Sequence, residues 1–240
     1  MKPVSKIPSL VPPQQSESPA GIGVNRGAEI AARDAERRRA QRESETAERL
    51  ENPGAWIAEC GVPPQITRRI APTFGAGIHP VAENWSGDPW SLTILGPKGA
   101  GKTFLGVLVL ARFAAPHPRG WSSSWRGLWV DFAEAFDAVR LEIGTDRDGR
   151  TLRSMLDADM LVIDDVGSDR GARAESSAFR QERLSMVLRH RYNHLLPTVL
   201  TANLHALDVI VPGDERIEDR LAEGLTIRLA GESLRERRSP

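Results

Sequence analysis

The 240-residue sequence contains one cysteine, Cys60, which excludes an intramolecular disulfide and any cysteine-rich zinc site. It has no apolar stretch long enough to cross a bilayer. Prolines interrupt the first residues repeatedly, so they lack the apolar core of a secretory signal. The 32 basic and 32 acidic side chains cancel, so no global field favours a nucleic acid or a membrane. These absences predict a cytoplasmic protein, in a reducing compartment, without a membrane partner.

Two segments of unusual composition precede the rest of the chain. Residues 1–25 are rich in Pro, Ser, Gln and Gly, a composition that cannot offset the entropy of ordering, so we expect a disordered tail. Residues 26–55 are rich in Ala, Glu and Arg, with opposite charges three or four positions apart, which predicts a solvated helical arm. This arm is either a linker or a docking segment for a partner protein. Residues 56–240 are expected to form one domain.

Short aliphatic runs alternate with helical periodicity through this domain. The alternation predicts an α/β fold with a parallel sheet flanked by helices. The expected strands are 90–95, 127–132, 159–164, 197–201 and 225–229, and the expected helices are 103–113, 132–141 and 175–194.

A glycine-rich motif lies between the first expected strand and the first expected helix. It reads Gly96-Pro97-Lys98-Gly99-Ala100-Gly101-Lys102-Thr103, a complete G-x-x-x-x-G-K-[ST] phosphate-binding loop. The glycines let successive N–H groups point at phosphate oxygens, and the positive end of the helix adds to that field. Lys102 is expected to reach the β- and γ-phosphates, and the Thr103 hydroxyl to ligate Mg²⁺. The alternative is a chance glycine-rich turn, against which both flanking elements and the Lys-Thr pair argue.

Two aspartates lie at the end of the third expected strand, and they narrow the classes of phosphate-binding protein that fit the sequence. A carboxylate at the C-terminal tip of a buried strand lies beside the phosphate loop in a doubly wound sheet. Asp164 is therefore predicted to hold the Mg²⁺ shell, and Asp165 to orient or deprotonate the attacking water. The alternative for either residue is a simple strand cap before Gly167. Because aspartate reaches less far than glutamate, Asp165 suggests a water-bridged role or slow hydrolysis.

The fourth expected strand ends at Thr201-Ala202-Asn203. An asparagine there can hydrogen-bond both the γ-phosphate and the lytic water, since the neighbouring strand ends belong to the nucleotide site. Its alternative role is to cap a helix that begins near residue 204.

Taken in order, these motifs resemble those of the DnaC/IstB-type AAA+ ATPases, over about residues 56 to 236. In that family the double Asp at the strand tip is usual, whereas the usual Thr-Ser-Asn is Thr201-Ala202-Asn203 here, which loses a hydroxyl and keeps the amide. The resemblance implies ATP with Mg²⁺ as ligands and a sheet order of 5-1-4-3-2, without the C-terminal helical lid of larger relatives. It is carried by 96–103, 161–167, 191–193, 196–204, 215–224 and 231–235.

The resemblance also assigns roles to three further residues. Asn203 is the polar sensor, Arg220 the arginine finger inserted into a neighbour's ATP site, and Arg235 a second sensor that touches the γ-phosphate within the chain. A planar, permanently charged guanidinium suits the charge that develops during phosphoryl transfer. On the sequence alone, a helix-surface arginine that pairs with Glu215, Asp219 or Glu223 is the preferred interpretation of Arg220. Arg216 is the easiest residue to confuse with it.

By the same resemblance, two roles share this core, namely helicase loading and assistance to a transposase. Both imply self-association on DNA with ATP between subunits. We expect a bacterial or phage helicase loader, because a tail and charged helix ahead of the core resemble a tether for a replicative hexameric helicase delivered to single-stranded DNA. The alternatives are an IstB-like helper of a transposase and a nucleotide-switched adaptor with little hydrolysis. Arginines between the second and third expected strands are candidate phosphate contacts, although acids among them make a plain solvated surface equally consistent: Arg140, Arg147, Arg150 and Arg153.

Overall fold

The computed structural model of the chain describes residues 21–51, 53–70, 79–113, 126–167, 174–203 and 214–230. The chain divides into two compact units, one up to Gln41 and the other from Arg42 onward. Residues 1–20 of the expected disordered tail lie outside the described residues.

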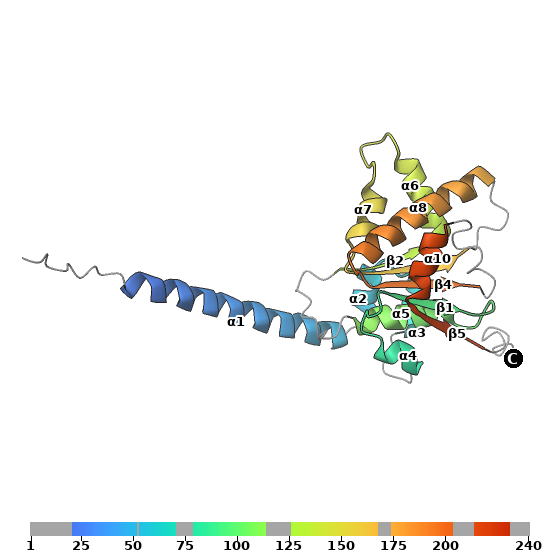
Figure 1. Cartoon of the computed structure of the whole chain (residues 1–240). Helices are drawn as coiled ribbons and strands as arrows, with labels where there is room; N and C mark the ends of the chain where they lie inside the picture. Colours follow the sequence, from blue (N-terminus) through green and yellow to red (C-terminus); the bar gives the residue numbers. More distant parts are fainter. Residues whose placement is uncertain are drawn as a thin grey trace, which may run out of the picture. The chain divides into compact units, whose positions relative to one another are not determined.

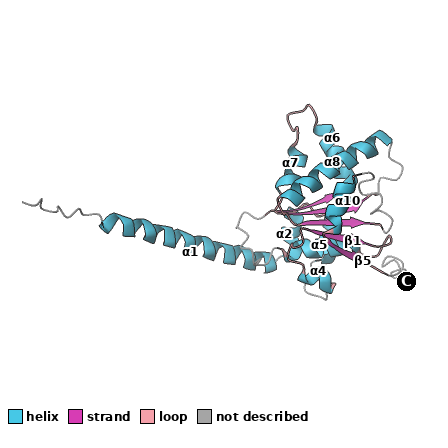
Figure 2. Cartoon of the chain, in the orientation of Figure 1, coloured by secondary structure: helices cyan, strands magenta, loops and turns pink. Residues whose placement is uncertain are grey.

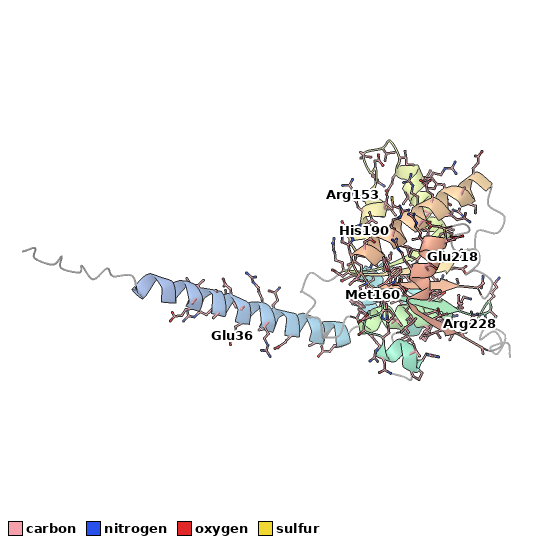
Figure 3. All side chains as sticks on the ribbon, viewed as in Figure 1. Glu36, Arg153, Met160, His190, Glu218 and Arg228 are labelled. Carbon is pink, nitrogen blue, oxygen red and sulfur yellow. The ribbon has the colours of Figure 1, made fainter. Side chains whose placement is uncertain are left out.

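The first long element is the helix α1 (Gly21–Glu51), which begins five residues before the expected start at residue 26. No proline occurs between Pro19 and Pro53, so nothing interrupts the backbone hydrogen bonds of this span. Every α1 side chain whose burial is described is exposed, including Ile30. Figure 3 shows such side chains, Glu36 among them, projecting from the helix. The helix offers a charged surface rather than an apolar face.

A five-stranded sheet, with every neighbouring pair parallel, forms the centre of the second unit (Figure 2). Its order is β2-β3-β4-β1-β5, which confirms the expected order 5-1-4-3-2 read from the other edge. Because all strands run the same way, their C-terminal ends meet at one edge of the sheet. The strands are β1 (Ser91–Leu95), β2 (Gly127–Asp131), β3 (Met160–Val166), β4 (Thr198–Ala202) and β5 (Leu225–Arg228).

Helices cover both faces of the sheet, and two apolar clusters fill the layers between them (Figure 1). Strand alternation divides the sheet's side chains, so that Ile94 belongs to one cluster and Leu95 to the other. The first cluster joins the sheet to α2 (Pro53–Glu59), α3 (Pro64–Ile70), α4 (Pro80–Asn84) and α5 (Lys102–Arg112). The second joins it to α6 (Phe132–Glu142), α7 (Arg150–Asp157), α8 (Ala174–Asn193) and α10 (Glu215–Ala222).

The helix α7 has no counterpart among the helices expected from periodicity, and a buried arginine holds it in place. Arg191 of α8 is fully buried. It donates to the carbonyl oxygens of Met155 (2.9 Å), Ala158 (2.7 Å) and Pro197 (2.8 Å) and to Thr198 Oγ1 (2.8 Å). Burial lowers the pKa of Arg191 to about 9, which still leaves it charged at neutral pH. One guanidinium thus ties the end of α7 to α8 and to the start of β4.

Among the described residues, no helix combines the length and the apolarity that a membrane span requires.

Candidate nucleotide-binding site

The glycine-rich motif connects β1 to α5, as the strand–loop–helix pattern predicts. Gly99 and Gly101 have φ angles of 85° and 91°, in the left-handed region that favours glycine. Ala100 N donates to the carbonyl oxygen of Pro97 at 3.2 Å, which closes the turn, and the Lys98 side chain is exposed. The loop has the curled backbone that a phosphate-binding loop requires.

Gly96, at the start of the loop, has no room for a side chain. A Cβ there would lie 3.1 Å from Leu229 Cβ and 3.2 Å from the carbonyl oxygen of Leu229. Leu229 is fixed because its N–H donates to Leu95 O at 2.7 Å. The loop therefore leaves β1 pressed against the end of β5.

Lys102 is mostly buried, and its ammonium group lies over the loop. The Nζ atom donates to Gly96 O (2.9 Å), Pro97 O (3.0 Å) and Asn203 Oδ1 (3.1 Å). Burial lowers the pKa of Lys102, and the charges of Asp165 and Asp164 oppose that shift. The structure thus brings together the predicted phosphate-binding lysine and the predicted sensor asparagine, which are 101 residues apart in sequence.

Asp164 is buried at the C-terminal end of β3. One carboxylate oxygen, Oδ2, accepts from Thr103 Oγ1 at 2.8 Å, and the other, Oδ1, accepts from Thr201 Oγ1 at 2.5 Å. Burial raises the pKa of Asp164, and these two hydrogen bonds oppose that shift. The two residues predicted to ligate a metal, Thr103 and Asp164, are therefore in direct contact.

A hydroxyl and a carboxylate oxygen are the hard ligands that Mg²⁺ prefers. Within the described ranges, no group of three or more His, Cys, Asp or Glu side chains could hold a metal ion by itself. The pair Thr103 and Asp164 fits an ion that takes its remaining ligands from substrate phosphates and water, which is the usual pattern for Mg²⁺.

Asp165 adopts a left-handed backbone conformation, with a φ of 57°. The pairing of β3 with β4 shifts register between Ile163 and Val166, so the strand is irregular at this point. The N–H of Asp165 donates to Thr201 Oγ1 at 2.9 Å. Its side chain is half-buried, unlike that of Asp164. The two aspartates consequently face different surroundings, although they are adjacent in sequence.

Thr201 is a site residue that the sequence analysis missed. Its hydroxyl donates to Asp164 and accepts from the N–H of Asp165, and the whole residue is buried. Its methyl group faces α5, where a Cβ at Gly106 would lie 3.2 Å from Thr201 Cγ2. A threonine at a strand end, two residues before the sensor asparagine, was the available signal. Hydroxyls inside an aliphatic strand need a polar partner, and here that partner is the carboxylate.

Arg220 does not join this group within one chain. Its carbonyl oxygen accepts from Trp90 Nε1 at 3.1 Å, and Trp90 directly precedes β1, whereas the phosphate-binding loop follows it. A five-residue strand is roughly 16 Å long, so Arg220 lies near the opposite edge of the sheet from the loop. Arg235 and the helix expected after Asn203 lie outside the described residues.

Comparisons with solved structures found several replication proteins. A DnaC helicase loader is 22% identical, with 69% of this chain and 90% of that chain covered and a TM-score of 0.47. DnaI is 21% identical, with 60% and 71% covered and a TM-score of 0.44. AMPPCP-bound DnaA from Aquifex aeolicus is 17% identical, with 57% and 39% covered and a TM-score of 0.45.

The sequence comparisons identify a family, which the solved structures do not. No curated protein matches the chain. A family model described as IstB-like ATP binding protein matches residues 82–239, which include the loop, both aspartates, Thr201 and Asn203. The chain belongs to the family of IstB-like ATP-binding proteins.

Proposed function

We propose that this protein binds and hydrolyses ATP at the loop between β1 and α5. The observation that carries the proposal is the meeting of three separate segments at one edge of the sheet. Lys102 contacts Asn203 at 3.1 Å, and Thr103 contacts Asp164 at 2.8 Å. A cation, an amide, a hydroxyl and a buried carboxylate beside a glycine turn are the groups that a triphosphate with its metal ion requires.

Each group has a distinct part in the proposed reaction. Backbone N–H groups in the part of the 96–103 loop that follows Pro97, together with the Lys102 ammonium, would bind the phosphates. Thr103 and Asp164 would hold Mg²⁺, which supplies charge neutralisation when bound. Asp165 and Asn203 would orient the attacking water. Asp165 is suited to this because its half-buried carboxylate follows Asp164 directly.

The proposed arginine finger requires a second copy of the chain. Arg220 lies near the opposite edge of the sheet from the loop of its own chain, a position that supports action on a neighbour's nucleotide. Hydrolysis would therefore depend on self-association, with ATP at the subunit interface. Arg235 would touch the γ-phosphate within the chain, as in the family resemblance.

Nucleotide binding and turnover test the first part of the proposal. Calorimetry with a non-hydrolysable ATP analogue and Mg²⁺ should show binding to the wild type and none to Lys102→Ala, because the buried ammonium has no substitute. Arg68→Ala, at an exposed position on α3, is the matched control and should bind normally. Equal affinity of wild type and Lys102→Ala would contradict the assignment of the loop.

We further propose that the protein loads a replicative hexameric helicase onto single-stranded DNA. Support comes from α1, a long helix whose described side chains are all exposed and many of them charged, so that they can contact a partner protein. Reversing two charges on one face of this helix, Arg33→Glu with Arg37→Glu, should weaken capture of the purified helicase. Arg68→Glu, a charge reversal on α3, should leave capture unchanged. Equal capture by both variants would contradict a docking role for α1.

Single-stranded DNA would contact the turn between α6 and α7. Arg147 and Arg150 are exposed there. Arg153 instead folds back, donating to Asp148 O at 3.0 Å, and Arg140 donates to Ser176 Oγ at 2.8 Å. Figure 3 labels Arg153 on α7. Replacing Arg147 and Arg150 by Ala should therefore reduce DNA affinity and its salt dependence more than replacing Arg153 does.

Help to a transposase is the second candidate function, because the matching family is IstB-like and the sequence resemblance associates IstB-like ATPases with that role. It requires ATP-dependent assembly on duplex DNA and recruitment of a transposase, with no effect on helicase delivery. A single assay that offers both a helicase and duplex DNA separates the two roles. The adaptor alternative fails if DNA stimulates vigorous ATP turnover.

A further inference from the structure

A polar pocket away from the nucleotide-binding loop lies between α8 and α10. Its volume is about 370 Å³. It is lined by Arg189, Asp214, Glu215, Arg216, Ile217 and Arg220. Three guanidinium groups in one pocket provide donors for an anion, and one of them belongs to the proposed arginine finger.

The side chain of Arg220 rests on an aromatic ring beside this pocket. Its Cζ atom lies 4.6 Å from the centroid of the Tyr192 ring, within the distance at which a cation is attracted to the face of an aromatic ring. The Tyr192 hydroxyl donates to the Glu223 carboxylate, with its oxygens at 3.0 Å and 3.2 Å. The ring is thus anchored at its far end.

Trp90 contacts both Tyr192 and Arg220. Its ring meets the Tyr192 ring edge to face, with centroids 5.5 Å apart and an interplanar angle of 86°. Its Nε1 donates to the carbonyl oxygen of Arg220 at 3.1 Å. Trp90 is buried, so it fixes both the ring beneath the guanidinium and the main chain that carries it.

We propose that Tyr192 is a positioning residue that aims Arg220 at the triphosphate of ATP bound to a second copy of this chain. This inference rests on the proposed function of Arg220. A long, flexible arginine loses rotamer freedom when it acts on a reacting group, and a ring that holds it beforehand removes part of that loss. Tyr192, Glu223 and Trp90 provide such a support, because each contacts either Arg220 or the ring beneath it.

Two substitutions at Tyr192 separate positioning from packing. Tyr192→Leu keeps an apolar side chain against the core cluster but removes the aromatic face, whereas Tyr192→Phe keeps the face and loses the hydroxyl. We expect Tyr192→Leu to lower kcat of ATP turnover by about 2- to 30-fold with KM unchanged, the range that a cation–π contact supplies. Tyr192→Phe should stay within about threefold of the wild type. Urea unfolding of both variants checks that the fold is retained.

A mixing experiment gives a readout that a merely structural role would not move. A Lys102→Ala chain cannot use its own loop, but it retains Tyr192 and Arg220. Adding it in excess to Tyr192→Leu should raise turnover per Tyr192→Leu chain toward the wild-type value, because the neighbour then supplies a correctly aimed Arg220. A chain that is simply destabilised would gain nothing from this neighbour.

The Arg220→Ala variant distinguishes failure of this inference from failure of the proposed function. If Arg220→Ala turns over ATP as fast as the wild type, or the wild type shows no turnover, the proposed role of Arg220 fails and the inference with it. If Arg220→Ala is slow while Tyr192→Leu matches the wild type, or mixing gives no recovery, the inference about Tyr192 alone is wrong. Slow turnover of Tyr192→Leu that recovers on mixing supports it.

Discussion

Replacing Thr201 by valine tests how the metal-binding carboxylate is held. Valine has nearly the same shape and keeps a methyl group toward Gly106, so the change removes the hydroxyl with little change in packing. That hydroxyl makes two hydrogen bonds, a buried one to Asp164 Oδ1 and a partly buried one from the N–H of Asp165. A hydrogen bond to a charged group contributes about 1.5–3 kcal/mol and a neutral one about 0.5–1.5 kcal/mol. We therefore expect the free energy of unfolding to fall by about 2–4 kcal/mol.

The same substitution should weaken magnesium-dependent nucleotide binding. Without the Thr201 hydroxyl, the Asp164 carboxylate keeps its hydrogen bond from Thr103 and can rotate away from the metal position. Loss of a residue that orients a metal ligand typically costs about 10-fold or more in metal affinity. Titration of Mg²⁺ at fixed ATP analogue measures this shift.

Thr201→Ser is the matched control because it keeps the hydroxyl and loses the methyl group. It should retain the magnesium dependence of the wild type and lose about 1 kcal/mol of stability, as expected for one buried methyl group. Urea unfolding and the Mg²⁺ titration of Thr201→Val and Thr201→Ser together decide the question. If the two variants behave alike, the hydroxyl does not hold Asp164 and the reasoning is refuted.

Three further predictions concern stability and titration. Arg191→Leu should destabilise the fold by about 3 kcal/mol or more in urea unfolding, because the carbonyl oxygens of Met155 and Ala158 lose the buried guanidinium that donates to them; a wild-type unfolding curve would contradict this. Gly106→Val should cost about 1–3 kcal/mol in the same assay, since α5 would have to move away from the sheet, and an unchanged midpoint would show that α5 can yield freely. Tyr192 is the sequence's one tyrosine, and its hydrogen bond to Glu223 raises the pKa of the phenol above its ordinary 10.0, because the carboxylate stabilises the protonated form. Absorbance titration near the tyrosinate band should show a lower pKa in Glu223→Ala, and an identical curve would exclude that hydrogen bond.

Much of the fold followed from local patterns that have a direct physical cause. Aliphatic runs of strand length alternating with helical periodicity gave five parallel strands, and the resemblance to a known family gave their order, which the structure confirms. The glycine motif was placed correctly because its flanks, a strand and a helix, are themselves strong signals. The positions of Asp164 and Asn203 near the loop followed from the common direction of the strands.

The residues that sequence reasoning missed act through contacts between distant segments. Thr201 and Arg191 are polar residues in otherwise apolar surroundings, and their function depends on partners 33 to 37 positions away. Local periodicity carries no information about such partners. The helix α7 was missed for a related reason, since it is short and has one buried residue, Met155, so its apolar pattern is weak.

The role of Arg220 was inferred from a family resemblance. The contacts of Arg220 with Tyr192 and Trp90 could not be inferred in that way. Tyr192 lies in α8 and Trp90 precedes β1, so neither neighbours Arg220 in sequence. Tyr192 lies in the 191–193 segment that carries part of the resemblance, but the resemblance assigns it no role. The contact between its ring and the guanidinium now supplies a physical reason.

Hydrogen exchange of the 240-residue chain, with and without an ATP analogue and Mg²⁺, tests the central claim most directly. If the triphosphate binds at the loop between β1 and α5, the amides of 98–103 and of Asp165 should exchange more slowly with nucleotide, and Lys102→Ala should abolish this protection. Amides in α3 should be unaffected. Nucleotide-induced protection elsewhere in the chain, with the loop unchanged, would contradict the account.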